Sequence, residues 1–148
     1  MLILTSILTI LFPIIFLPFN ALMIFLSKKH EVKKAYCILF AISVAILMYI
    51  FIPSEDMDLS RYYKIMDGYQ NLSLESFLSS VSVSTEFLMK LIFFSFSKLN
   101  DHHLIMIFVT LISYFIQIYI IFDYQKTKKL TNLQFNIILF FFLSTFLI

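Results

Sequence analysis

The sequence opens with an apolar run that contains no charged side chain from Met1 to Leu26. It lacks the positive first part and the small-residue cleavage site of a signal peptide, which indicates a retained span. Further apolar runs cover Ala35 to Ile52 and Leu104 to Phe122, each long enough to cross about 30 Å of hydrocarbon. A fourth run begins near Leu133 and is still apolar at Ile148. These runs predict an all-α fold, a polytopic transmembrane helical bundle of about four spans.

Composition supports lipid as the solvent for this chain. Of its 148 residues, 61% are apolar, whereas soluble domains average just under half. A small soluble domain leaves much of its surface exposed and cannot hide that excess in a core. Pro13 and Pro18 should kink the first span, which a membrane helix tolerates when neighbouring groups satisfy the freed carbonyls.

The charges are segregated along the chain, and the lysines predict its orientation. They crowd the first and last connections between runs, at Lys28, Lys29, Lys33, Lys34, Lys126, Lys128 and Lys129. Cytoplasmic loops carry such an excess, so both connections should be cytoplasmic. The polar segment from about Pro53 to His103 holds most of the acidic residues and should form an outer loop, with the N-terminus also outside.

One segment of this outer loop complicates the topology. Residues Phe77 to Leu99 are apolar enough to suggest a further span, but Glu86 and Lys90 lie within them. Ionised groups at mid-bilayer cost at least ~2.5 kcal/mol each on insertion scales. A span here would also place the last lysine cluster outside. We therefore expect an interfacial or re-entrant helix, one of one or two short interfacial helices in the loop.

The segment from Asp58 to Gly68 predicts the first of these helices, with Asp58 as its N-cap and Gly68 as its left-handed C′ residue. Its apolar face has helical spacing and consists of Leu59, Tyr62, Tyr63 and Met66. Arg61 and Lys64 project from the opposite side, where the pair could clamp a diphosphate. The alternative is an ordinary amphipathic helix with snorkelling cations.

The segment from Ser84 to Lys98 predicts the second helix, capped by Ser84 or Thr85. The polar groups that should share one narrow stripe of it are Glu86, Lys90, Ser97 and Asp101. A carboxylate between lipid and water suits a general base, which makes Glu86 a candidate. The alternative is a Glu86–Lys90 pair that merely makes the helix interfacial.

The remaining polar residues give weaker signals. Cys37 has no second cysteine to pair with and should be a packing residue. His102 and His103 are adjacent, so their side chains diverge on a helix and do not suit zinc. Gln117 and Asn136 should make interhelical hydrogen bonds. No metal or other cofactor is expected, and the absence of a basic patch interleaved with aromatics excludes nucleic acid as a partner.

The order of these parts resembles the EpsG family of exopolysaccharide polymerases, which are related to the Wzy O-antigen polymerases. Its members open with two spans around a lysine-rich cytoplasmic turn, here Ser27–Lys34. An Asp is followed by a Tyr four residues later in an outer loop, here Asp58 and Tyr62. A Glu then starts a Leu-rich helix, here Glu86–Ile92, and an uncharged span leads to a basic turn, here Asp123–Lys129. The likeness covers nearly the whole chain.

This resemblance implies a multi-pass protein of the bacterial inner membrane that polymerises lipid-linked oligosaccharide repeats at its outer face. The product would be an exopolysaccharide, O-antigen or capsule chain, and the enzyme a glycosyltransferase. Its substrate would be an undecaprenyl-diphosphate-linked oligosaccharide. Its further partners would be membrane lipid and other polysaccharide-assembly proteins. The family has a basic motif beyond its fourth span that has no counterpart here, and Phe146, Leu147 and Ile148 are still apolar where a span normally closes with interfacial residues. We therefore expect the chain to be the N-terminal portion of a longer protein, or a truncated product, forming a single integral membrane domain.

The reaction needs a base near the acceptor hydroxyl and cations on the departing diphosphate. Glu86 or Asp58 is the candidate base. The candidate substrate-binding groups are the two cations and two aromatic rings of the first outer helix, Arg61, Lys64, Tyr62 and Tyr63. The competing class is a non-enzymatic membrane protein, such as a transporter fragment or an accessory subunit of a polysaccharide export system. A transporter should place polar groups and broken helices at the midplane, whereas the ionisable residues here collect in the outer loop.

Overall fold

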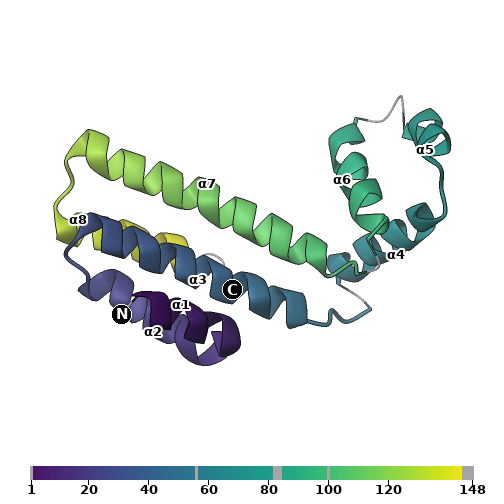
Figure 1. Cartoon of the computed structure of the whole chain (residues 1–148). Coiled ribbons are helices and arrows are strands. Elements are labelled where there is room, and N and C mark those ends of the chain that lie inside the picture. The colour runs from purple at the N-terminus through teal and green to yellow at the C-terminus, as the bar shows by residue number, and fades with distance from the viewer. Residues whose placement is uncertain (1, 56, 82–84, 100, 145–148) are drawn as a thin grey trace. The chain divides into compact units, whose positions relative to one another are not determined.

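The computed structural model describes residues 2–55, 57–81, 85–99 and 101–144, with side chains as far as residue 141. These residues form eight helices and no strand, which confirms the predicted all-α class (Figure 1). The helices are α1 (Leu2–Leu11), α2 (Pro13–Leu26), α3 (His30–Ile50), α4 (Asp58–Gln70), α5 (Leu74–Val81), α6 (Phe87–Ser97), α7 (Leu104–Lys128) and α8 (Asn132–Ser144). The chain divides into two compact units. Unit 1 is Met1–Met48 with Ile107–Ile148, and unit 2 is Tyr49–Met106.

Two helices are long and apolar enough to cross a membrane. They are α3 with 21 residues and α7 with 25, and they coincide with the predicted second and third spans. Both extend further than expected at their lysine-rich ends. The α3 helix begins at His30, and α7 continues to Lys128, so most of the last basic connection is helical. The chain turns at Lys129, which has a φ of 50°.

The first apolar run forms two helices, so the prediction of one kinked span from Met1 to Leu26 is wrong. The break lies at Phe12, which has φ −133° and ψ 61°. Pro13 follows it, and a residue before proline is kept out of the helical region by steric conflict. At 1.5 Å per residue, α1 is about 15 Å long and α2 about 21 Å, both shorter than the hydrocarbon core.

A buried polar network explains why α1 packs back against α2 rather than extending it. The Asn20 amide on α2 donates to Thr9 Oγ1 on α1 at 3.1 Å and to Ser43 Oγ on α3 at 3.3 Å. Asn20, Thr9 and Ser43 are all buried. Buried amide groups need partners in apolar surroundings, and the Asn20 amide obtains these two only when the three helices meet.

The core of unit 1 joins α2, α3, α7 and α8 through aliphatic and aromatic side chains. Its largest fully buried members are Tyr36, Tyr114, Phe40, Phe135, Ile24 and Leu139. Cys37 is also fully buried in this core, which confirms its packing role. The predicted fourth span is represented by α8, whose described part has 13 residues and is shorter than a span.

One lysine of the first connection lies inside this core. Lys33 is 3% exposed, and its Nζ donates to Asn136 Oδ1 at 2.5 Å and lies over the Phe135 ring. The Asn136 amide donates to the Phe25 carbonyl at 3.4 Å. The interhelical role expected of Asn136 is therefore confirmed. A similar role for Gln117 is not, because its Oε1 is buried without a hydrogen-bond partner among the described residues.

Unit 2 packs α4 and α5 against α6. One part of its core contains Met66, Phe93 and Ile105, and the other stacks the Phe77 and Phe94 rings at 4.3 Å. The segment expected to form one interfacial or re-entrant helix is divided into α5 and α6, with residues 82–84 outside the described part. With 8 and 11 residues, both helices are too short to span a bilayer.

The ends of α4 differ from the predicted ones. Met57 is the N-cap, so Asp58 lies in the first turn and not at the cap. Gly68 does not end the helix either, since it lacks a positive φ and α4 continues to Gln70. Instead, a residue distant in sequence supplies hydrogen bonds to the carbonyls at the end of α4. Lys98 Nζ donates to the carbonyls of Tyr69, Gln70 and Leu72 at 3.3, 2.9 and 2.6 Å.

The α6 helix also departs from its predicted cap and stripe. Glu86 is the N-cap residue and makes no side-chain capping bond, so the Thr85 cap is wrong, while Ser84 lies outside the described residues. Ser97 is fully buried, and its hydroxyl donates to the Phe94 carbonyl, so it is not part of an exposed polar stripe. Asp101 lies beyond the end of α6.

Candidate functional site

The predicted amphipathic character of α4 is confirmed. Met66 is fully buried and Tyr63 partly buried, whereas Arg61 and Lys64 on the opposite side are exposed. The Tyr62 ring lies 5.2 Å from that of Phe93 on α6, centroid to centroid. Tyr62 is still 36% exposed, so part of its ring surface remains accessible.

Arg61, one of the two cations of the proposed clamp, is paired with a carboxylate. Arg61 Nη1 lies 3.2 Å from Asp58 Oδ1, and the side chains are 70% and 75% exposed. Such an exposed ion pair contributes at most about 1 kcal/mol. A diphosphate, with its higher charge and two oxygens for a guanidinium fork, could therefore replace the carboxylate at little cost.

The other candidate base pairs along its own helix. Glu86 Oε2 lies 4.0 Å from Lys90 Nζ, and the Glu86 side chain is 61% exposed. This is the i, i+4 arrangement that the sequence offered as the simpler alternative. The Asp58–Arg61 and Glu86–Lys90 pairs each join residues that are close in sequence. The structure thus brings Asp58 and Arg61 together, but neither pair connects α4 to α6.

A more closely connected group of polar side chains lies at the start of α7, and we call it the Asp101 cluster. Its members are Tyr49, Tyr63, Asp67, Asp101, His102 and His103. Asp101 uses both carboxylate oxygens. Oδ2 accepts a hydrogen bond from the Tyr49 hydroxyl at 2.5 Å, and Oδ1 accepts one from the His103 backbone N–H at 2.9 Å. The second bond is an Asx turn that leads into α7.

The two histidines of the cluster have different partners. His102 Nδ1 lies 3.3 Å from Asp67 Oδ1, with the His102 side chain 16% exposed. His103 Nδ1 lies 3.5 Å from the Tyr63 hydroxyl, and the two rings are 5.1 Å apart, centroid to centroid. Tyr63 therefore connects α4 to the segment before α7.

The electrostatics of the cluster follow from these contacts. The Tyr49 hydroxyl bond, assisted by the His103 N–H, holds the pKa of Asp101 below its ordinary value, so the carboxylate stays ionised. Burial, together with the nearby Asp101 charge, raises the pKa of Tyr63 and keeps its phenol protonated. The cluster accordingly offers a fixed anion, a phenol donor and two imidazoles.

A paired imidazole and carboxylate can move a proton. Asp67 can orient the His102 ring, as carboxylates do for catalytic histidines. A hydroxyl hydrogen-bonded to the other ring nitrogen would then lose its proton to His102. Among the residues that the structure describes, no group of three or more His, Cys, Asp and Glu side chains is placed to hold a metal ion.

Sequence reasoning considered these histidines only as zinc ligands and missed their carboxylate and tyrosine partners. The run Asp101-His102-His103 at the start of a span was the available signal. The partners could not be found in this way, because Asp67 lies 35 residues from His102 in the chain and Tyr49 lies 52 residues from Asp101.

Comparisons of the chain with profiles of known families, with curated proteins and with solved structures each found no match.

Proposed function

We propose that the chain is part of a bacterial inner-membrane polymerase that joins lipid-linked oligosaccharide repeats, as its resemblance to the EpsG family implies. The observation that carries this proposal is the position of the reactive side chains along the chain. Potential acid, base and cationic groups gather in unit 2, which in the sequence comes between most of α3 and most of α7, the two helices that are long enough to span a membrane. A reaction on lipid-linked substrates needs such groups at the membrane surface.

The exposure of α7 supports a membrane location. Only 22% of its most apolar 18-residue stretch is buried within the chain. A core helix of a soluble protein would bury most of that stretch. Exposed members include Ile116, Tyr119 and Ile120, which are 54%, 71% and 54% exposed. Lipid would cover these side chains if α3 and α7 cross the bilayer.

The lysine-rich ends of α3 and α7 support the proposed orientation. The rings of His30, at the start of α3, and Phe122, near the end of α7, are 4.7 Å apart, centroid to centroid. The two connections therefore lie at the same end of unit 1, as the excess of lysines on the cytoplasmic side requires. The segment between α3 and α7 would then face outward.

In the proposed reaction, a hydroxyl oxygen of the acceptor sugar forms a bond to the anomeric carbon of the donor. The bond from that carbon to the diphosphate oxygen breaks, and the diphosphate leaves with the electron pair. Arg61 and Lys64 would stabilise the leaving anion. The hydroxyl proton would pass to Glu86 or Asp58, or to His102 of the Asp101 cluster. Tyr62 and Tyr63 would provide ring surfaces for sugars.

The test uses the complete gene product in its native host and follows polymer length by gel laddering. Arg61→Lys should shorten the polymer, since an ammonium cannot form a bidentate diphosphate contact. Glu86→Gln should leave single repeats if Glu86 is the base, and His102→Gln should do so if His102 is. Glu75→Gln, an exposed carboxylate change on α5, is the matched control and should keep the normal ladder.

Normal ladders in all three variants, with normal protein levels, would contradict the proposed site. If removal of the whole protein also left the ladder intact, the polymerase function itself would be wrong. Loss of polymer on removal of the protein, combined with normal ladders in every variant, would instead indicate an accessory subunit.

A further inference from the structure

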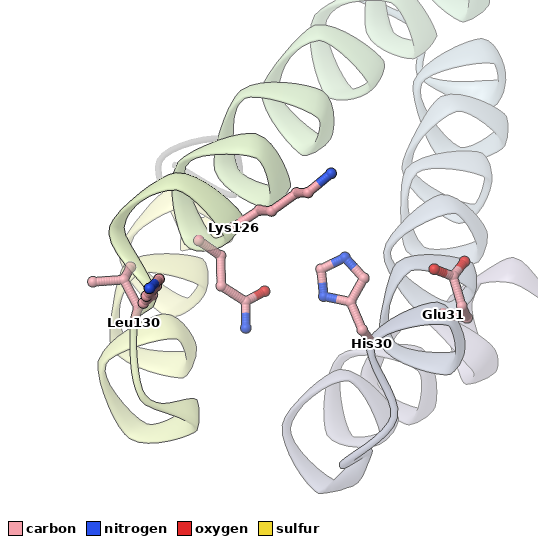
Figure 2. A pocket seen from close by; sticks show the side chains of 6 residues that line it. His30, Glu31, Lys126 and Leu130 are labelled. Carbon is pink, nitrogen blue, oxygen red and sulfur yellow. The ribbon is translucent and has the colours of Figure 1, made fainter.

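The lysine-rich ends of α3 and α7 line an open pocket that the proposed reaction does not use. Its volume is about 480 Å³, and its lining residues are His30, Glu31, Gln125, Lys126, Lys129 and Leu130. They come from the first turn of α3, the last turn of α7 and the connection to α8. Figure 2 shows the His30 ring and the Lys126 side chain projecting into the space between the two helices.

Charge at the pocket favours an anion. The lining contains two lysines, Lys126 and Lys129, and one carboxylate, that of Glu31. Glu31 lies in the first turn of α3, where the helix dipole stabilises it. The His30 ring is held in place by its edge contact with Phe122 and can add a further donor.

The pocket also has groups for a ligand that donates hydrogen bonds. Gln125 Oε1 is buried and has no hydrogen-bond partner among the described residues. A buried amide oxygen without a partner is destabilising, and a ligand hydroxyl or ammonium could donate to it. Glu31 offers a second acceptor. The lining therefore suits a phosphate ester that carries hydroxyl groups better than it suits a bare phosphate.

The backbone conformation at Lys129 is one that a lysine does not favour. Its φ of 50° belongs to the left-handed region, where glycine is preferred after a helix. The Leu130 N–H donates to the Gln125 carbonyl at 3.3 Å and closes the turn. A β-carbon in this conformation is unfavourable, yet it directs a cation toward the pocket.

We propose that this pocket binds the phosphate headgroup of an anionic membrane lipid, such as phosphatidylglycerol. The inference rests on the membrane location in the proposed function. Basic pockets between membrane helices on the cytoplasmic side are suited to such headgroups. The acyl chains would lie along the exposed apolar side chains of α7, among them Tyr119 and Ile120.

The test measures binding to the purified full chain in neutral detergent, with short-chain phosphatidylglycerol, phosphatidylcholine and inorganic phosphate as probes. Native mass spectrometry counts the bound molecules. Phosphatidylglycerol should bind at least tenfold more tightly than either other probe. The double variant Lys126→Ala, Lys129→Gly should lose about tenfold or more in that affinity, since each lysine beside the bound anionic headgroup contributes roughly fivefold. Glycine suits the turn, so the variant should keep its helix content.

The matched control is Lys28→Ala, Lys128→Ala, which removes the same charge from neighbouring positions that do not line the pocket. Its affinity should change less than twofold. Equal losses in both double variants would overturn the pocket in favour of general surface charge. Inorganic phosphate binding as tightly as phosphatidylglycerol would overturn the lipid. Equal binding of both lipids would overturn the anionic headgroup.

If the first variant loses helix content, Lys126→Gln with Lys129→Asn replaces it, because asparagine tolerates a left-handed backbone. The measurement contains no polysaccharide. A failure of the polymerase proposal would therefore leave the binding result unchanged, and a failure to bind lipid would leave the gel ladder unchanged.

Discussion

The end of α4 depends on a lysine from another helix, and this dependence can be measured. Lys98 Nζ contacts the carbonyls of Tyr69 and Gln70 in the last turn of α4 and that of Leu72 just beyond it, and it lies 4.7 Å from the centroid of the Phe94 ring. Lys98→Met keeps most of the aliphatic stem and removes the charge and the donors. The last turn of α4 then exposes unpaired carbonyls, which water must solvate.

The magnitude follows from the exposure of the ammonium group. Hydrogen bonds to charged groups contribute about 1.5–3 kcal/mol when buried, but solvent competes at this exposed site. A cation at a helix C-terminus contributes about 0.3–1 kcal/mol, and an exposed cation–π contact about 0.5–1 kcal/mol. We expect a total of about 1.5–2 kcal/mol, which corresponds to roughly 10- to 30-fold in the opening equilibrium.

Amide hydrogen exchange of the full chain in detergent measures this opening. Peptides covering α4 should exchange roughly 10- to 30-fold faster in Lys98→Met, while α7 peptides should be unchanged. The control is Lys64→Met, which removes an exposed cation from the middle of α4, where methionine is as good a helix former. Exchange of α4 within threefold of the unmodified protein would refute the capping role. An equal increase in the control would attribute the effect to net charge.

Three further predictions concern other parts of the molecule. Asn20→Leu should lower the stability of unit 1 by about 1–2 kcal/mol in a urea titration, because the Thr9 and Ser43 hydroxyls each lose a hydrogen bond from the Asn20 amide; an unchanged midpoint would contradict it. Tyr49→Phe should raise the pKa of Asp101 in an NMR titration. The lowered pKa of Asp101 stabilises the folded state at pH values above the ordinary aspartate pKa of about 3.9. This contribution is lost as the pH falls through the pKa of Asp101 in the folded state. In intact cells, cysteines at Lys29 and Lys128 in a cysteine-free background should resist an impermeant reagent; ready labelling at either would reverse the orientation.

Periodicity was sufficient to predict where most helices lie. The long uncharged runs located α3 and α7, and the helical spacing of Tyr63 and Met66 identified the buried side of α4. The break at Phe12 was harder to predict, because a proline can either kink a span or end a helix. Only the Asn20 amide, by joining α1 and α3, decides between those outcomes, and its partners cannot be found from local sequence.

The candidate site was predicted less well for a related physical reason. Asp58 and Glu86 were chosen as candidate bases, and the structure places each beside a cation close to it in sequence, the arrangement that was expected for Glu86 only as the alternative. His102 was dismissed because its neighbour in sequence could not share a metal ion. Its carboxylate partner comes from α4, and tertiary proximity alone reveals it. Local geometry predicts pairs within a helix, and long-range pairs need the fold.

The lysines of the basic connections show how far charge counting can be used. Lys33 was counted as a surface cation, yet it is buried against Asn136 and Phe135. Removing it from the count leaves three lysines before α3 or in its first turns and three around the end of α7, so the expected orientation is unchanged. The structure does change the role assigned to individual lysines. Lys33 joins α3 to α8, whereas Lys126 and Lys129 line a pocket. Orientation depends on their number, but binding depends on which side chains the fold brings together.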